Sequence, residues 1–109
     1  MMKNLDKINE IKRNEVVAML SIPEIVKYFD SIKIFGSAIT DRCREDSDID
    51  MYVTLKPEYV QEDIVESTWR LLMRASKSDK DIIYAHEMTD HINNSLFNAM
   101  QNGIEVLKD

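Results

Sequence analysis

The sequence predicts an α/β (α+β) domain, in which helices pack on a small mixed β-sheet. Stretches with helical spacing of apolar residues alternate with short apolar runs. Only two Gly and two Pro interrupt the 109 residues, and 44% of the residues are hydrophobic. We therefore expect one compact domain over residues 1–109, with elements in the order helix, strand, strand, helix, strand, helix.

The N-terminal part of the chain predicts two helices. Apolar residues recur at helical spacing from 5 to 20 without Gly or Pro, which indicates an amphipathic helix. Ser21, Pro23 and Glu24 then match a capping box, with Ser21 as the N-cap and Pro23 in the first turn. A short second helix is expected through about Tyr28.

Two strands are predicted in the middle of the chain. Residues 31–35 form a short apolar run that ends at Gly36, as expected of a buried strand. Residues 48–55 alternate between apolar and polar, so successive side chains are expected on opposite faces of a sheet. One face carries Ile49, Met51, Val53 and Leu55, and the other carries Asp48, Asp50, Tyr52 and Thr54.

The C-terminal half predicts a helix, a strand, a helix and an edge strand. The first of these helices opens at Pro57 and places on one stripe Val60, Ile64, Leu71, Leu72 and Ala75. A third strand is expected at residues 81–85. The last helix is expected to begin near Asp90, to end at Gly103, and to turn inward Ile92, Leu96, Ala99 and Met100. Residues 104–107 then form a short edge strand.

Charge and cysteine content exclude several classes of protein. The formal net charge of −6 argues against direct binding to nucleic acid, which usually needs a basic face. The single cysteine, Cys43, cannot form an internal disulfide, as suits a reducing cytosol. No signal peptide or membrane span is visible, so we expect a cytoplasmic protein.

Two carboxylates, Asp48 and Asp50, are separated by one residue in the second predicted strand. Such positions lie ~6.6 Å apart on one face, so the carboxylates can converge on metal ions ~3.5–4 Å apart. Mg²⁺ suits this arrangement because it binds a few carboxylates together with waters and substrate phosphates. From residue 36 to 50 the chain carries five acids and two Arg, which would repel a bare triphosphate, so a divalent ion is expected. The alternative is an acidic strand face in solvent.

The residues around this pair have functional and plain structural interpretations. Gly36 lets backbone amides approach a phosphate and Ser37 can add a hydroxyl donor, although an ordinary strand-ending turn explains the same pair. Asp81 could bind metal and act as general base if the third strand neighbours the second; otherwise it is a surface acid. Arg42 and Arg44 either contact phosphate or ribose, or belong to a solvated loop.

These motifs resemble those of the nucleotidyltransferase superfamily that includes DNA polymerase β, and more narrowly its minimal nucleotidyltransferase (MNT) branch. The resemblance covers about residues 31–85. It rests on Ile34-Phe35-Gly36-Ser37, a ten-residue spacer, Ser47-Asp48-Ile49-Asp50 and the later Lys80-Asp81-Ile82-Ile83.

The resemblance implies a reaction and a set of site residues. Two Mg²⁺ ions, or Mn²⁺ in their place, would be held by Asp48, Asp50 and Asp81. An acceptor hydroxyl would attack the α-phosphate of ATP or another NTP and release pyrophosphate, while Gly36 and Ser37 hold the β- and γ-phosphates. Many such proteins pair with a small helical HEPN protein as toxin and antitoxin, and the MNT partner adenylylates or otherwise neutralises the toxin.

The chain also departs from the family pattern. Many members carry an Arg directly after Gly-Ser and a Gly a few residues later, where this chain has Ala38 and Asp41. The leading hypothesis is transfer of AMP to a hydroxyl of a partner protein, because a domain of this size offers an open cleft rather than a deep pocket. The alternatives are a non-catalytic module that blocks a helical partner, and an aminoglycoside-type transferase that needs a second subunit.

Overall fold

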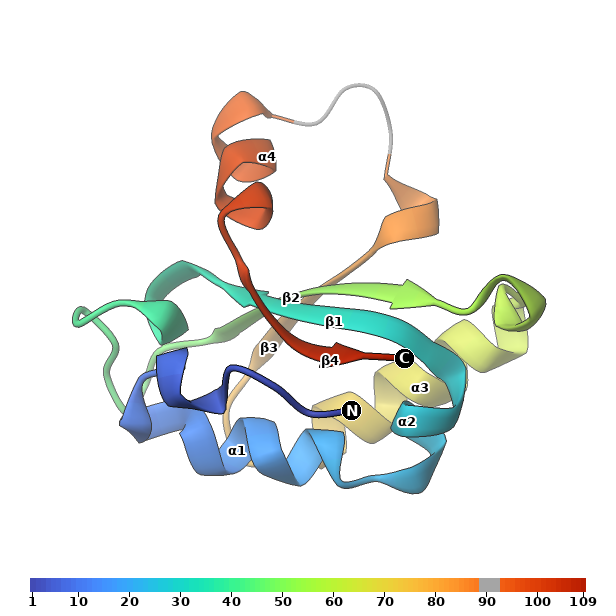
Figure 1. Ribbon diagram of the computed structural model, residues 1–109, viewed down its shortest axis with the longest axis horizontal. Helices are drawn as coiled ribbons and strands as arrows, with labels where there is room; N and C mark the ends of the chain where they lie inside the picture. Colours follow the sequence, from blue (N-terminus) through green and yellow to red (C-terminus); the bar gives the residue numbers. More distant parts are fainter. Residues whose placement is uncertain (89–92) are drawn as a thin grey trace.

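The computed structural model describes residues 1–88 and 93–109 and confirms the expected mixed α/β fold (Figure 1). Its sheet has the strand order β3-β2-β1-β4. The strands are β1 (Phe29–Phe35), β2 (Ile49–Leu55), β3 (Lys80–Tyr84) and β4 (Ile104–Lys108). β1 pairs antiparallel with both β2 and β4, whereas β3 pairs parallel with β2. The third strand therefore neighbours the second, and the last strand lies at an edge.

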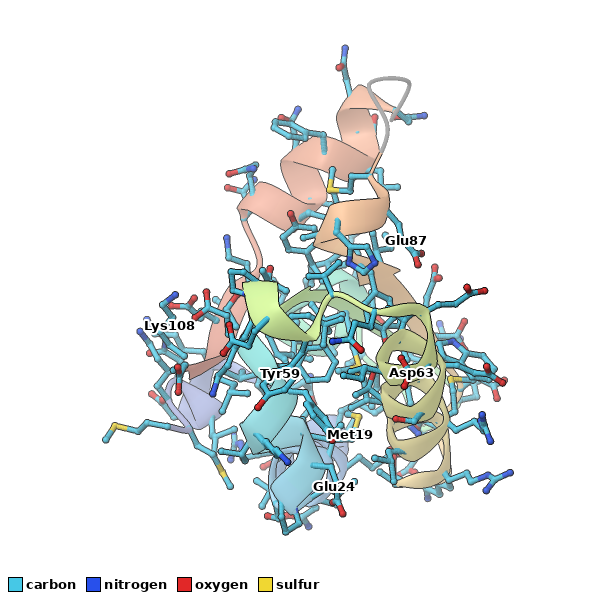
Figure 2. The ribbon with its side chains drawn as sticks, turned by 90° about the vertical axis from the view of Figure 1, so that its right-hand side faces the viewer. Met19, Glu24, Tyr59, Asp63, Glu87 and Lys108 are labelled. Carbon is cyan, nitrogen blue, oxygen red and sulfur yellow. The ribbon has the colours of Figure 1, made fainter. Side chains whose placement is uncertain are left out.

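Helices cover the two faces of the sheet unequally. The α-helices are α1 (Glu10–Leu20), α2 (Pro23–Tyr28), α3 (Glu62–Arg74) and α4 (Asn94–Gln101). Helices α1, α2 and α3 lie against one face, and α4 stands on the other side (Figure 1). Figure 2 shows α4 and the turn at Glu87 on that same side, apart from the other helices. No helix in the described part of the chain is long and apolar enough to cross a membrane.

The main core lies between the sheet and α1–α3. The alternation predicted for the second strand holds, because every second residue of β2 is buried. Helices, strands and the turns beside them contribute the core residues: Ile8, Val16, Met19, Leu20, Ile25, Phe29, Ile32, Ile34, Ala38, Ile49, Met51, Val53, Leu55, Leu72, Tyr84, Val106 and Leu107. Phe35 and Met100 are also buried but lie outside this cluster. Because Phe35 pairs with Asp50, we place it on the opposite face, where α4 packs on β1.

The first predicted helix is broken in two. A 3₁₀ turn covers Leu5–Lys7, and α1 begins only at Glu10. Asn9 causes the break, because its side chain caps α1 by accepting a hydrogen bond from the Ile11 amide at 3.0 Å. The Asn9 amide donates to the Ala38 carbonyl at 2.8 Å, which holds this non-helical residue against the turn after β1.

The capping box predicted at Ser21 is wrong. Ile22 precedes Pro23 as the N-cap of α2 and gives no side-chain cap. Ser21 instead ends α1, and its hydroxyl donates to the Val17 carbonyl at 2.7 Å. The two helices are so close along the chain that this hydroxyl serves the end of the first helix rather than the start of the second.

The helix predicted from Pro57 also begins later than expected. Pro57–Tyr59 forms only a 3₁₀ turn, and α3 starts at Glu62 after the extended Gln61. Val60 lies in the break and is 43% exposed, so it does not belong to the buried stripe of α3.

The start predicted for the last helix falls outside the described residues. Asp90 and Ile92 belong to the segment 89–92, and the described helix α4 begins at Asn94, capped by Asn93. Gly103 follows the C-cap of α4 as expected, and its amide donates to the Met100 carbonyl at 3.1 Å. A Cβ at Gly103 would lie 3.1 Å from the Ile34 carbonyl oxygen, so glycine also permits close approach to β1.

A polar cluster around the buried Lys12 joins α1 to the loop before β2 and to the loop before β3. Lys12 is fully buried, and its ammonium donates to the Glu45 carbonyl at 2.8 Å and to the Ser78 hydroxyl at 2.7 Å. The Glu15 carboxylate lies 3.7 Å from this ammonium and accepts from the Ser78 amide at 2.9 Å and from its hydroxyl at 2.6 Å. The ammonium of Lys80 donates to the Ser78 carbonyl at 2.8 Å. We call Lys12, Glu15 and Ser78 the α1 polar cluster.

This environment changes the pKa of Glu15. Partial burial is the largest single influence and raises the pKa, but hydrogen bonds from Ser78 and the charge of Lys12 contribute to lowering it to about 2 from 4.5. A carboxyl with a lowered folded-state pKa stabilises the fold above its unfolded value and loses that contribution as the pH falls. Glu15 therefore loses its stabilising contribution as the pH falls from about 4.5 to about 2.

We expect Glu15→Gln to reduce the free energy of unfolding by about 2 kcal/mol at pH 7, because charge-assisted hydrogen bonds are lost. The loss should shrink between pH 4.5 and pH 2, where the wild-type carboxylate takes up its proton. Urea unfolding at pH 7, 4 and 3 measures this difference. The control is Glu66→Gln, which removes an exposed ion pair with Arg70 and should cost less than about 1 kcal/mol. An equal loss for Glu15→Gln at all three pH values contradicts the assignment.

Candidate active site

The turn after β1 holds Gly36 in a conformation that other residues rarely adopt. Its φ is +73°, in the left-handed region that favours glycine. An added Cβ would overlap the Asp50 Oδ2 atom and lie 3.1 Å from the Asp50 Cγ. Gly36 therefore has two independent reasons to be glycine, and its α-carbon lies directly against the side chain of Asp50.

Two of the predicted acids lie side by side on neighbouring strands. Asp50 of β2 and Asp81 of β3 are register partners in the parallel pairing. Side chains of such partners leave the sheet on the same face. Asp50 is also the register partner of Phe35, the residue before Gly36. The Gly36 turn at the end of β1, Asp50 of β2 and Asp81 of β3 therefore lie on three consecutive strands of the sheet.

Asp48 lies in the loop just before β2, because the strand begins at Ile49. The prediction that Asp48 belongs to the strand is therefore wrong by one residue. Its charge still reaches the pair. The pKa of Asp50 is raised first by burial and then by the negative charges of Asp81 and Asp48. The structure thus brings Asp48 and Asp81 within electrostatic reach of Asp50.

The donor set fits a hard divalent cation. Carboxylate oxygens are the ligands that Mg²⁺ and Mn²⁺ prefer. Within residues 1–88 and 93–109, no three Asp, Glu, His or Cys side chains already converge tightly enough to hold an ion. Uncompensated carboxylates repel one another, so a cation is the partner that would draw these three oxygen ligands together.

An open pocket of about 390 Å³ adjoins the Gly36 turn. It is lined by Gly36, Ser37, Ile39, Thr40, Arg42, Ala99 and Asn102. Ser37 belongs to the 3₁₀ turn Gly36–Ile39, and Arg42 is exposed. Both residues line the pocket and can therefore contact a ligand in it. Ala99 and Asn102 come from α4 and its C-cap, and sequence reasoning missed them as lining residues. No local signal marks them, because they reach the site only through the packing of α4 on β1.

Arg44 is not brought to this pocket. It is exposed in the loop before β2, where its backbone amide donates to the Ser47 hydroxyl at 2.9 Å. The two arginines singled out together in the sequence therefore differ in position, and Arg42 is the better placed to meet a phosphate.

The departure from the family pattern at position 38 has a structural explanation. Ala38 is fully buried in the main core, so a long charged side chain does not fit there in this conformation. Asp41 is exposed beside Thr40 and lines a different hollow, next to α1.

Comparisons with known proteins bear on the family and the fold of this chain. A family model described as "Polymerase beta, Nucleotidyltransferase" matches residues 21–108. A chain in the crystal structure of a mutant of the toxin–antitoxin MntA–HpeT has a similar fold, with a TM-score of 0.57 and 18% sequence identity. That similarity covers 88% of this chain and 73% of the other chain. No curated protein sequence matches.

We expect Gly36→Ala to lower the free energy of unfolding by about 1–2 kcal/mol for the left-handed backbone alone, and further because its Cβ overlaps Asp50. Urea unfolding measures the loss, and Ser37→Ala is the matched control, expected to change stability by less than about 0.5 kcal/mol. Adding Asp50→Ala should recover part of the loss, as a double-mutant cycle can test. An equal cost of Gly36→Ala with and without Asp50 would show that the overlap is relieved elsewhere.

We expect Asp50→Asn to raise the free energy of unfolding at pH 7 by up to about 1 kcal/mol, because like charges on opposed strand positions are destabilising. The raised pKa gives the sign, since ionisation of Asp50 then favours the unfolded chain. Thermal unfolding without divalent ions measures the change. Asp30→Asn removes an exposed ion pair with Lys108 and serves as the control. A stability loss for Asp50→Asn refutes the expected repulsion.

Proposed function

The chain belongs to the polymerase beta nucleotidyltransferase family, and on that premise we propose that it is a divalent-metal-dependent nucleotidyltransferase. The observation that carries this proposal is the pairing of Asp50 with Asp81 on adjoining strands, with Asp48 in electrostatic reach. A structural role for this arrangement is unconvincing, because adjacent like charges reduce stability. Acids kept together at such a cost are typical of a site that binds cations.

The residues divide into two groups in the proposed reaction. Asp48, Asp50 and Asp81 would hold two Mg²⁺ ions, or Mn²⁺, which supply charge stabilisation for both the attacking and the leaving oxygen when bound. Gly36 and Ser37 would contact the β- and γ-phosphates of the NTP, and Arg42 is placed to add a positive charge at the same pocket. ATP is the expected nucleotide.

The proposed chemical step is a single displacement at the α-phosphorus. The acceptor hydroxyl oxygen forms a bond to that phosphorus, and the bond from phosphorus to the bridging oxygen of the β-phosphate breaks. Pyrophosphate leaves with that bonding pair, and Asp81, whose side chain is exposed, would take the hydroxyl proton as general base. The products are the nucleoside monophosphate ester of the acceptor and pyrophosphate.

We assign the acceptor to a partner protein. The pocket beside Gly36 is open rather than enclosed, so a large acceptor can approach it. The similar fold of a chain from the MntA–HpeT toxin–antitoxin structure favours an antitoxin role of the same kind. We therefore propose that the chain adenylylates a hydroxyl of a small helical HEPN-type toxin in the cytoplasm.

We expect the wild-type protein to bind Mg-ATP in isothermal titration calorimetry and to lose that binding when Mg²⁺ is omitted. Asp48→Asn/Asp50→Asn should abolish metal-dependent binding and lower transfer by about a thousandfold, because several kcal/mol of charge stabilisation are lost. The control is Glu62→Gln/Glu66→Gln. It makes the same change in net charge on α3, which covers the opposite face of the sheet (Figure 1).

Transfer itself is measured as a gain of one AMP in the mass of a co-purified helical partner. Unchanged transfer by the Asp48→Asn/Asp50→Asn variant refutes the proposal. Neutralisation of the partner without transfer, and without any need for Mg-ATP, favours the non-catalytic blocking module. Transfer only to a small hydroxylated molecule in the presence of a second subunit favours the aminoglycoside-type alternative.

A further inference from the structure

We propose that Lys12 and Glu15 are positioning residues for the acid cluster, by which we mean Asp48, Asp50 and Asp81. Together they connect the two loops that lead into Asp48 and Asp81. This inference rests on the proposed function, since it concerns the geometry of the same site. None of the three residues of the α1 polar cluster lines the pocket beside Gly36. They are expected to act through the loops they hold.

The first loop leads into Asp48, and hydrogen bonds within the loop link the residue that Lys12 contacts to Asp48. The Lys12 ammonium binds the Glu45 carbonyl, three residues before Asp48. Between them, the Ser47 amide donates to the Arg44 carbonyl at 3.1 Å, and the Ser47 hydroxyl accepts from the Arg44 amide at 2.9 Å. A displacement of the Glu45 carbonyl is therefore transmitted to Asp48 through a hydrogen-bonded turn.

The second loop is held by the same ammonium. Ser78 lies three residues before Asp81, and its hydroxyl accepts from Lys12 and donates to Glu15. The Lys80 ammonium also holds this loop, because it donates hydrogen bonds to the Ser76 and Ser78 carbonyls. In addition, the Ile49 amide donates to the Asp79 carbonyl at 2.9 Å, which ties the start of β2 directly to this loop.

The acid cluster needs such a brace. Asp50 and Asp81 are register partners on adjoining strands, and Asp48 lies two residues before Asp50, so their like charges tend to separate the three carboxylates. In metal sites, groups behind the ligands orient them, and their removal typically lowers metal affinity 10–100-fold. The α1 polar cluster lies one step further back, because it holds the chain at Glu45 and Ser78, three residues before Asp48 and Asp81 respectively.

Stability alone does not account for a Lys–Glu pair whose lysine is fully buried and whose glutamate is partly buried. Apolar residues of similar size often stabilise a protein as well or better than a buried ion pair. Lys12 lies on the face of α1 that also buries Val16 and Met19, where an apolar side chain would fit the pattern. The specific gain from Lys12 is its two hydrogen bonds to separate loops.

The chain supplies a matched control for this inference. Lys77 and Glu45 form an ion pair at 3.3 Å that joins the same two loops at the surface, with both side chains about three-quarters exposed. Exposed pairs contribute little. Lys77→Met therefore removes a contact between the same two loops and leaves the Lys12 contacts in place.

The test compares Mg²⁺ binding to wild type, Lys77→Met and Lys12→Met/Glu15→Leu, which replaces the buried pair by apolar residues and leaves no unpaired charge. MgCl₂ is titrated while the backbone amide NMR signals of Asp48 and Asp81 are followed, and far-UV circular dichroism reports the fold. We expect the apparent Mg²⁺ dissociation constant to rise about 10–100-fold in the double variant, and less than about twofold in Lys77→Met. Ser78→Ala should produce a smaller rise of the same kind.

The outcomes separate this inference from the proposed function. If wild type binds no Mg²⁺ at these amides, the assignment of the three acids as a metal site fails and the inference fails with it. If wild type binds and the folded double variant binds within twofold of it, only the positioning inference is overturned. Should the double variant not fold, Ser78→Ala decides: unchanged Mg²⁺ affinity overturns the inference, and a rise that Lys77→Met does not share supports it.

Discussion

The parallel pairing of β3 with β2 is the constraint on which the candidate site depends. It makes Asp50 and Asp81 register partners, and the antiparallel pairing of β1 on the other side of β2 brings Phe35 and the Gly36 turn to the same place. Two carboxylates in this position repel each other, and the pKa of Asp50 is raised first by burial and then by the charges of Asp81 and Asp48. The rest of the fold must supply the stability that this arrangement removes, and it does so through a core on the opposite face.

One face of the sheet thus forms the main core, and the other face carries Asp50 and Asp81. Helices α1, α2 and α3 bury the apolar side of β2 and provide the stability of the domain (Figure 1). Among the described residues, the other face carries the acids, the turn at Glu87 and α4 (Figure 2). Ala99 of α4 and its C-cap Asn102 help to line the pocket beside Gly36. A site built on strands is held rigidly.

Family membership and site geometry support the same kind of chemistry from different directions. The family match covers residues 21–108, and the geometry places three acids and a glycine turn together without reference to any relative. Burial of Ala38 commits the position after Ser37 to the core. Arg42, four residues further along the chain, lines the pocket beside Gly36.

Local pattern determined the elements and much of the site, whereas only the tertiary structure decided how they meet. The alternation along β2 set Asp50 opposite the buried residues, and the glycine at the end of β1 marked the turn, because both follow from backbone geometry over a few residues. The resemblance implied a third acid at Asp81, but its register with Asp50 depends on the crossover formed by residues 56–79, which no local signal encodes. The same holds for Asn102 in the pocket and for Lys12, whose helical pattern gives no hint of the two distant loops it binds. Ser21 failed as a predicted cap for the related reason that a hydroxyl can serve either of two adjoining helices, and packing selects which.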